Sequence, residues 1–274
     1  MYCELEFISL RTLKNMFMKQ MKFWMVALTI LMGVSFTSCM NGEKNTTTSG
    51  YLVAKVSNTF PAYEFKTLDG YTMSAATQQP NIIGTEASYG DLVYIAYTYD
   101  YEVDVDATNK KIKISLYGIE KIDGNQVMPA PSKDEPGYEG NRGVQAITIE
   151  GTNSTSKVSP FMYADNDNSK LVIPIIYYAK EKLSDHKFSI VYYEDELGQD
   201  QLVLHLRHFS SETEKEETKT GFSYKAFDIA SALYEYNNKN GRYPTEIKIY
   251  ADINTSGTSV PENPKSTIIP YERK

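Results

Sequence analysis

The chain has few of the residue types on which most enzymes and metal sites depend. Its 274 residues include only two cysteines, three histidines and one tryptophan. The glycine-rich phosphate-binding motifs and the G-x-S-x-G serine motif do not occur in it. So few thiols and imidazoles argue against thiol catalysis, a disulfide framework and most zinc sites. We therefore expect no catalytic residues, no metal site, no cofactor and no enzymatic activity.

Long apolar runs are also rare, and the clearest one lies near the start of the chain. Residues 23–36 form an apolar run of 14, preceded by the basic residues Arg11, Lys14, Lys19 and Lys22. As a helix the run would span about 21 Å, which is short for a bilayer core of about 30 Å. The pattern therefore indicates a secretory signal; a membrane-anchoring helix is the alternative.

A single cysteine follows this run directly. Small residues precede Cys39 in "FTSC", which resembles the lipobox of bacterial lipoproteins, although Phe36 stands where leucine is usual. We expect residues 1–38 to be a cleaved signal peptide and Cys39 to carry the lipid. Attachment to the membrane would then be through that lipid alone. The expected location is the bacterial cell envelope, on either the periplasmic or the outer surface.

The mature chain would have 236 residues and a distinct charge. The leader carries four basic residues and two acidic ones, Glu4 and Glu6, so removing its +2 from the total of −7 leaves −9. An acidic surface argues against nucleic acid as a partner. Cys3 falls within the leader, so the mature chain could form no internal disulfide.

The first part of the mature chain has the pattern of a small β-barrel. Residues 39–50 are polar and predict a flexible tether. Short runs rich in β-branched and aromatic residues follow within 51–125, with a turn signal at Asp69-Gly70. About five strands in this length predict an OB-like barrel. The expected strands include residues 52–56, 63–66, 90–105 (one long, bent strand) and 110–122.

The second part predicts an antiparallel β-sandwich over residues 144–274, after a proline- and glycine-rich linker at 126–143. One short helix is expected from Asp228 onward, with Ile229, Leu233 and Tyr236 on its buried face. The charged segment 211–220 predicts a solvated hairpin tip. The fold class is therefore all-β with one short helix. Expected strands are residues 144–149, 171–179, 187–193, 202–209, 245–253 and 267–271.

Three polar clusters are candidates for chemistry. His205 and His208 are three apart, so on a strand they point to opposite faces and cannot chelate one ion. We expect Arg207 beside them to pair with a carboxylate such as Glu194. The acids of 194–200 are expected in water at a hairpin tip, where no burial would raise a pKa. Residues 165–176 begin like a calcium loop but lack its glycine and final glutamate.

Tyrosine is abundant, with 22 residues in the chain. Most are expected in the scaffold, because tyrosine favours strands and forms cross-strand pairs. Tyr97, Tyr99, Tyr192 and Tyr193 are the candidates for contact with a partner. In an adjacent pair such as Tyr192-Tyr193, one ring is expected to face away from the core.

The order of several segments resembles the NigD-like lipoproteins of Bacteroidetes. The segments are "MGVSFTSC", "GDLVYIAYTYD", "KKIKISLYGIEKI", "DHKFSIVYYED", "LVLHLRHFS" and "FSYKAFDIASAL". This resemblance implies an OB-like N-terminal domain and a C-terminal β-sandwich. It implies no catalytic residues, and an accessory or immunity role linked to a bacteriocin.

Three functions remain open from the sequence. We favour a lipid-anchored, non-enzymatic envelope protein that binds a protein, peptide or glycan. The second is an immunity-type shield without a binding pocket. The third is a carbohydrate-active enzyme whose site is formed by separated acidic residues.

Overall fold

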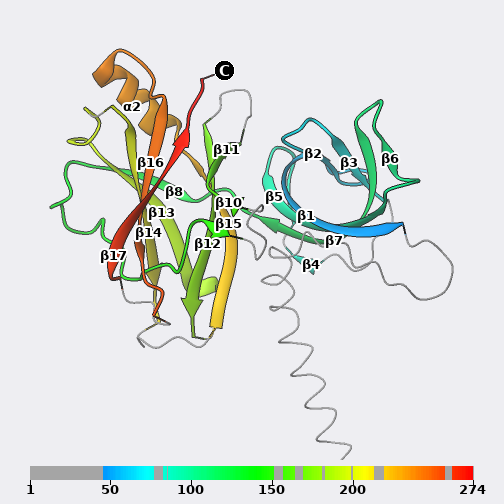
Figure 1. Cartoon of the computed structure of the whole chain (residues 1–274), viewed down its shortest axis with the longest axis horizontal. Helices are drawn as coiled ribbons and strands as arrows, with labels where there is room; N and C mark the ends of the chain where they lie inside the picture. The colour runs from blue at the N-terminus through cyan, green and yellow to red at the C-terminus, as the bar shows by residue number, and fades with distance from the viewer. Residues whose placement is uncertain are drawn as a thin grey trace, which may run out of the picture.

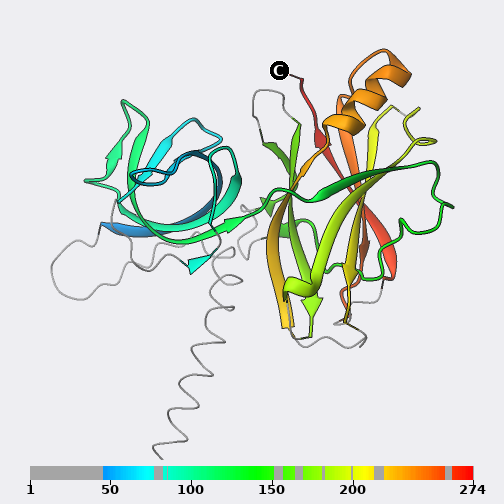
Figure 2. The same ribbon diagram turned by 180° about the vertical axis from the view of Figure 1, so that it is seen from behind.

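The computed structural model describes residues 46–76, 83–84, 86–150, 157–163, 169–180, 183–198, 200–212, 219–256 and 261–273. The expected signal peptide and Cys39 lie outside these residues. The described chain is all-β with one α-helix, as predicted. Figures 1 and 2 show a β-barrel beside a second body of packed sheets.

Five strands close the barrel. Their order is β1-β2-β3-β7-β5, and β5 pairs back to β1. The closing pair, β3 with β7, is parallel, while the other neighbours are antiparallel. Short strands β4 (Ile83–Gly84) and β6 (Val105–Asp106) extend the sheet along β7. The five strands are β1 (Thr47–Asn58), β2 (Glu64–Lys66), β3 (Thr72–Ala75), β5 (Leu92–Asp100) and β7 (Lys111–Lys121).

The predicted alternation on β7 is confirmed, with one change of face. Ile114 and Leu116 are buried in the barrel, but so is Ile119, three positions later. The register shifts there, because Tyr97 opposes Leu116 and Ala96 opposes Gly118. The extra residue forms a β-bulge. The bulge changes which alternate residues of β7 point into the barrel, so Leu116 and Ile119 both do so although they are three positions apart.

The predicted tether is too long. Thr47 to Gly50 already belong to β1, where they pair with Tyr97 to Asp100. The polar composition of this stretch predicted flexibility, but backbone pairing along β5 holds it in the sheet. Residues 101–104 then form the bend expected within the long strand at 90–105.

The second body consists of two facing sheets. One contains β17-β16-β14-β13-β8 and the other β11-β12-β15. Both sheets contribute to the largest core cluster, whose fully buried members include Leu171, Ile173, Leu204 and Phe227. The strands are β8 (Gln126–Ala130), β11 (Phe161–Tyr163), β12 (Lys170–Ala179), β13 (His186–Tyr193), β14 (Leu202–Ser210), β15 (Lys219–Asp228), β16 (Glu246–Ile253) and β17 (Asn263–Pro270).

The prediction of a purely antiparallel sandwich is wrong for two strand pairs. β8 runs parallel to β13, and β14 runs parallel to β16. After β14 the chain crosses to the opposite sheet as β15 and then returns through the helix to β16. This single traverse of the other sheet makes β14 and β16 run in the same direction. Two short strands, β9 (Ile149–Glu150) and β10 (Lys157–Val158), pair separately, and a 3-10 turn, η1 (Leu183–Asp185), precedes β13.

The predicted linker and its neighbouring strand also need correction. Residues 126–130 form β8 and pair with β13, so the linker prediction at 126–143 is wrong for these residues. In the expected strand at 144–149, Val144 and Ala146 make only isolated bridges, to Ile253 and Ile176. Strand β15 was not predicted, because its first residues belong to the charged segment that was interpreted as a hairpin tip.

The predicted helix is confirmed as α2 (Ala230–Asn240). The Asp228 side chain accepts a hydrogen bond from the Ala230 N–H at 3.1 Å. Leu233 and Tyr236 are buried as expected, and Gly241 ends the helix in the left-handed conformation. In the described part of the chain, no helix is long and apolar enough to cross a membrane.

Aromatic packing joins the barrel to the sandwich. Tyr94 of β5 lies 4.9 Å from Tyr224 of β15 and 6.0 Å from Tyr51 of β1, measured between ring centroids. The Ala226 N–H donates to the Ile122 carbonyl at 2.7 Å, directly after β7. The barrel therefore packs against β15 through both side chains and backbone.

Candidate functional site

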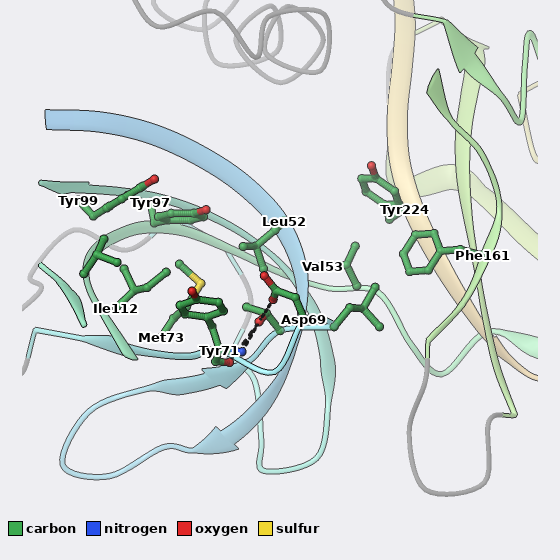
Figure 3. Close-up of a pocket in the computed structure, with 13 residues that line it drawn as sticks. Leu52, Val53, Asp69, Tyr71, Met73, Tyr97, Tyr99, Ile112, Phe161 and Tyr224 are labelled. Carbon is green, nitrogen blue, oxygen red and sulfur yellow. Dashed lines mark hydrogen bonds between the residues drawn. The ribbon is translucent and has the colours of Figure 1, made fainter. Parts of the chain in front are cut away.

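A cavity of about 520 Å³ lies at one end of the barrel. We call it the barrel-end cavity, and Leu52, Asp69, Tyr71, Met73, Tyr97 and Tyr99 are among the residues that line it. Figure 3 shows Tyr97 and Tyr99 on one side of the cavity, with Tyr71 and Met73 across from them. Two of the four predicted contact tyrosines therefore line one cavity.

Strand β5 positions Tyr97 and Tyr99. The two residues are two positions apart, so both side chains point to the same face of the strand. Their ring centroids are 5.9 Å apart. A Cβ placed on Gly50, the cross-strand partner of Tyr97, would lie 2.6 Å from the Tyr97 ring. Glycine at position 50 therefore lets the ring lie flat over the neighbouring strand.

The surroundings of Tyr97 further favour the neutral form of its hydroxyl. Burial first, and then the nearby Tyr99 and Asp69, raise the pKa of Tyr97 to about 12. A neutral phenol both donates and accepts hydrogen bonds. Tyr97 can therefore offer an apolar face and a hydroxyl to a ligand.

The β2–β3 turn forms another wall of the cavity. The Tyr71 N–H donates to Thr67 Oγ1 at 2.9 Å, and the Thr67 hydroxyl also bonds to the Asp69 carboxylate. Gly70 adopts a φ of +84°, which favours glycine. Lys110 Nζ donates to the Asp69 carbonyl at 3.3 Å and ties this turn to the loop before β7. The Asp69-Gly70 turn predicted from sequence thus places a carboxylate at the cavity.

The sandwich supplies the far edge of the cavity. Phe161 of β11 and Tyr224 of β15 line it beside Val53. Burial raises the pKa of Tyr224 to about 12. The Tyr163 hydroxyl donates to the Lys66 carbonyl at 2.8 Å and holds β11 against β2. The sequence did not identify Tyr71, Phe161 or Tyr224 as site residues. Closure of the barrel brings Tyr71 to the cavity, and packing of the sandwich on the barrel brings Phe161 and Tyr224 there.

The cavity suits binding better than hydrolysis. Asp69 is the one carboxylate among the described residues that line it, and none of those residues is a histidine. Glycoside hydrolysis by the usual mechanism needs two carboxyl groups. Aromatic faces with a few polar groups are typical of ligand sites.

The other two predicted contact residues are buried. Tyr192 is 3% exposed and Tyr193 is 1% exposed. Tyr192 belongs to the main core, and Tyr193 packs with Ala130 and Val191. The Tyr193 ring does face away from the main core, as predicted, but Tyr138, which follows β8, packs against it, so the ring is not exposed for contact. Tyr192 also lines a second cavity of about 500 Å³ beside α2.

The outer face of β14 carries a paired histidine. His205 Nε2 donates to Glu196 Oε2 at 2.7 Å, and Lys133 forms an ion pair with the same carboxylate. Burial would raise the pKa of Glu196, but the hydrogen bonds from Lys133 and His205 lower it. Burial lowers the pKa of His205. The expectation of solvated acids is therefore wrong for Glu196.

Arg207 on the same face pairs with a carboxylate, as predicted, although not with the residue given as the example. Its Nη1 lies 3.1 Å from Asp252 Oδ2, and its Nη2 donates to the Tyr193 hydroxyl at 2.8 Å. The partner is therefore Asp252 on β16 rather than Glu194, because parallel pairing of β14 with β16 brings these two side chains together.

His208 points to the opposite face, as predicted, and enters the core. Its Nδ1 donates to the Gly143 carbonyl at 2.9 Å, so its Nε2 accepts from His186 Nδ1 at 2.8 Å. His186 Nε2 faces Glu212 Oε2 at 3.2 Å. Burial lowers the pKa of His208 to about 3.

The described histidines and acids are not arranged as a metal site. Within the described ranges, no group of three or more His, Cys, Asp or Glu side chains is placed to bind an ion. Residues 165–168, which begin the segment compared with a calcium loop, lie outside the described residues. The histidines instead satisfy buried hydrogen bonds of the sandwich.

Comparison with known proteins returns structures rather than sequences. No family model matches the chain, and no curated protein matches it significantly. A protein from Bacteroides fragilis described as a candidate lipoprotein is 23% identical, with a TM-score of 0.65 over 82% of this chain and 99% of its own. A protein of unknown function, DUF1344, from Bacteroides vulgatus is 14% identical, with a TM-score of 0.50 over 82% of this chain and 92% of its own.

The matches also include a NigD-like immunity protein from Bacteroides caccae, at 12% identity and a TM-score of 0.46, over 80% of this chain and 93% of its own. At these identities the likeness concerns the fold. The chain shares its fold with the Bacteroides fragilis and Bacteroides vulgatus proteins.

Proposed function

We propose that the protein is a non-enzymatic lipoprotein of the bacterial cell envelope that binds a partner in the barrel-end cavity. The cavity carries this proposal, because it places Tyr71, Tyr97 and Tyr99 around one space of ligand size. The partner is a protein, peptide or glycan of the envelope.

Two further observations support the envelope location. The sequence predicts a signal peptide over residues 1–38, directly before Cys39. The Bacteroides fragilis protein with the same fold is described as a candidate lipoprotein. We propose that the lipid on Cys39 holds the two folded bodies at the membrane surface.

The two cysteines make a matched test of lipidation. We expect Cys39→Ser to abolish labelling by a clickable palmitate analogue and to release the protein from the membrane fraction. Cys3→Ser should change neither, because Cys3 lies in the expected leader. Labelling that survives Cys39→Ser would contradict the anchor.

A photocrosslinker tests the cavity. Placed at Tyr99, it should capture a partner from envelope extract, whereas the same group at Tyr89 should not. Tyr89 is 78% exposed but does not line the cavity, so it controls for nonspecific capture. Equal capture at both positions would contradict binding in the cavity. An immunity-type shield would instead protect cells from envelope toxins even when Tyr99 is replaced by alanine.

A further inference from the structure

We infer that the barrel-end cavity binds a neutral saccharide, which stacks on the tyrosine rings and forms hydrogen bonds with Asp69. This inference rests on the proposed function, because it names the ligand class of the same site. OB-like barrels bind oligosaccharides and oligonucleotides on one face. The residues around this cavity distinguish between such ligands.

The tyrosines match the shape of a sugar ring. Tyr97 and Tyr99 project from the same face of β5, and Tyr71 lies across the cavity from them (Figure 3). A pyranose ring has an apolar C–H face that packs on an aromatic ring and hydroxyls at its edge. Tyrosine offers both an apolar face and a hydrogen-bonding end.

The charges favour a neutral ligand. No lysine or arginine is among the described residues that line the cavity, so an anionic ligand would lack a counter-charge. Asp69 is exposed and its carboxylate can accept hydrogen bonds from hydroxyl groups. A cationic peptide would need a net negative charge at the cavity. Lys110, whose Nζ bonds to the Asp69 carbonyl, offsets the charge of the Asp69 carboxylate.

The cavity also lies at the end of the barrel where the chain enters. The Tyr101 N–H donates to the Thr46 carbonyl at 3.1 Å, and the Thr46 hydroxyl donates to Asp100 at 2.6 Å. Thr46 stands seven positions after Cys39. Seven extended residues reach at most about 25 Å. A lipid on Cys39 would therefore keep the cavity close to saccharides displayed on the membrane.

Methionine methyl groups report on binding without altering the site. Met73 lines the cavity, while Met128 lies on β8 of the sandwich. We would label the methionine methyls of the mature chain with ¹³C and add neutral tetrasaccharides of glucose, mannose and N-acetylglucosamine. Tetragalacturonate and a lysine–tyrosine peptide serve as acidic and basic probes.

A neutral tetrasaccharide is expected to shift the Met73 signal and leave Met128 unchanged. Tyr71→Ala and Tyr99→Ala should each weaken this binding about tenfold, a factor typical of losing a well-packed ring. Tyr89→Ala is the matched control and should bind as the wild type does. Repeating the titration with the lipidated protein and vesicles that display the same saccharide tells a membrane-borne source from a free one.

Two results would overturn the saccharide assignment. If only the basic peptide or only the acidic sugar shifts the Met73 signal, the ligand is not a neutral saccharide. The proposal that the cavity binds a partner would still hold. A Met73 signal that no probe moves would reject the saccharide, and the crosslink from Tyr99 would then decide whether the cavity binds anything.

Discussion

In both halves of the molecule a tyrosine ring lies over a cross-strand glycine, but the surroundings of the two rings differ. In the sandwich, Tyr177 opposes Gly221 and packs edge-on against Phe188, with ring centroids 5.1 Å apart. In the barrel, Tyr97 opposes Gly50 and lies beside the cavity. The same local pair therefore fills a core where a second sheet covers it and faces a ligand-sized space where the barrel ends.

The histidines show the same contrast, because all three belong to the sandwich and none to the barrel. They are buried there in hydrogen-bonded networks, whereas Asp69 at the cavity is exposed. We therefore assign the histidines a structural role in the sandwich and keep the proposed binding site at the barrel end.

The largest expected difference between the two bodies is in how much stability each loses at low pH. The pKa of His208 is about 3 in the folded protein and about 6.5 in an unfolded chain. Between these values the unfolded chain binds a proton that the folded one does not, so stability falls as pH drops. The loss approaches roughly 4 kcal/mol near pH 3.

Hydrogen exchange at a series of pH values measures this effect. Gly143, Arg142, His186 and Glu212 surround His208 and contribute to its pKa. Amides of the sandwich should lose protection before those of the barrel, and His208→Gln should flatten the pH dependence. Earlier loss in the barrel would count against this account.

Two leucines compare the closed core with the open end. Leu204 is fully buried in the sandwich, whereas Leu52 lines the cavity. Leu204→Ala should lower the free energy of unfolding by about 2.7–5 kcal/mol, because it leaves an enclosed hole. Leu52→Ala should cost roughly 1 kcal/mol, since it enlarges an existing space. Urea denaturation measures both, and equal losses would show that the barrel end is as closed as the core.

The two glycines test the tyrosine pairs directly. A Cβ at Gly221 would lie 2.6 Å from Tyr177 and 2.9 Å from Leu183, so both would have to move. We expect Gly221→Ala to cost about 1–3 kcal/mol. Gly50→Ala should cost less, because Tyr97 can shift into the cavity, and it should weaken ligand binding. Thermal unfolding and the Met73 titration give the two readouts; a larger loss for Gly50→Ala would reverse the comparison.

The smallest effect is expected at the barrel surface. Lys121 Nζ lies 2.8 Å from Asp91 Oδ1, and the lysine side chain is 41% exposed. Lys121→Ala should lower the free energy of unfolding by less than about 1 kcal/mol. Adding salt should reduce the difference further, and a loss that persists in salt would indicate packing by the lysine stem instead.

Local patterns in the sequence predicted the elements with the clearest periodicity. The alternation at Ile112, Ile114 and Leu116 gave the strand β7. The spacing of Ile229, Leu233 and Tyr236 gave the helix α2, although its N-cap is Ile229 rather than the predicted Asp228. The Asp69-Gly70 turn was found for the same reason. Each depends on residues within a few positions of one another.

Whether a strand face is buried depends on which distant segments pack on it, and the local patterns did not predict this. Alternation correctly places Tyr192 and Tyr193 on opposite faces of β13, but both faces are covered, so neither ring faces solvent. Glu196 looked like part of a solvated acidic turn, yet Lys133 and His205 enclose it. The parallel pairing of β14 with β16 likewise depends on the chain crossing between sheets.

The sequence alone determines the all-β character, the short helix and a strand that presents Tyr97 and Tyr99 on one face, because strand alternation and helical periodicity are local properties. Only the tertiary structure decides that these rings meet Tyr71 around a cavity while Tyr192 and Tyr193 are buried. The physical reason is that burial depends on which distant strand covers a face, and nothing within a strand specifies its cover.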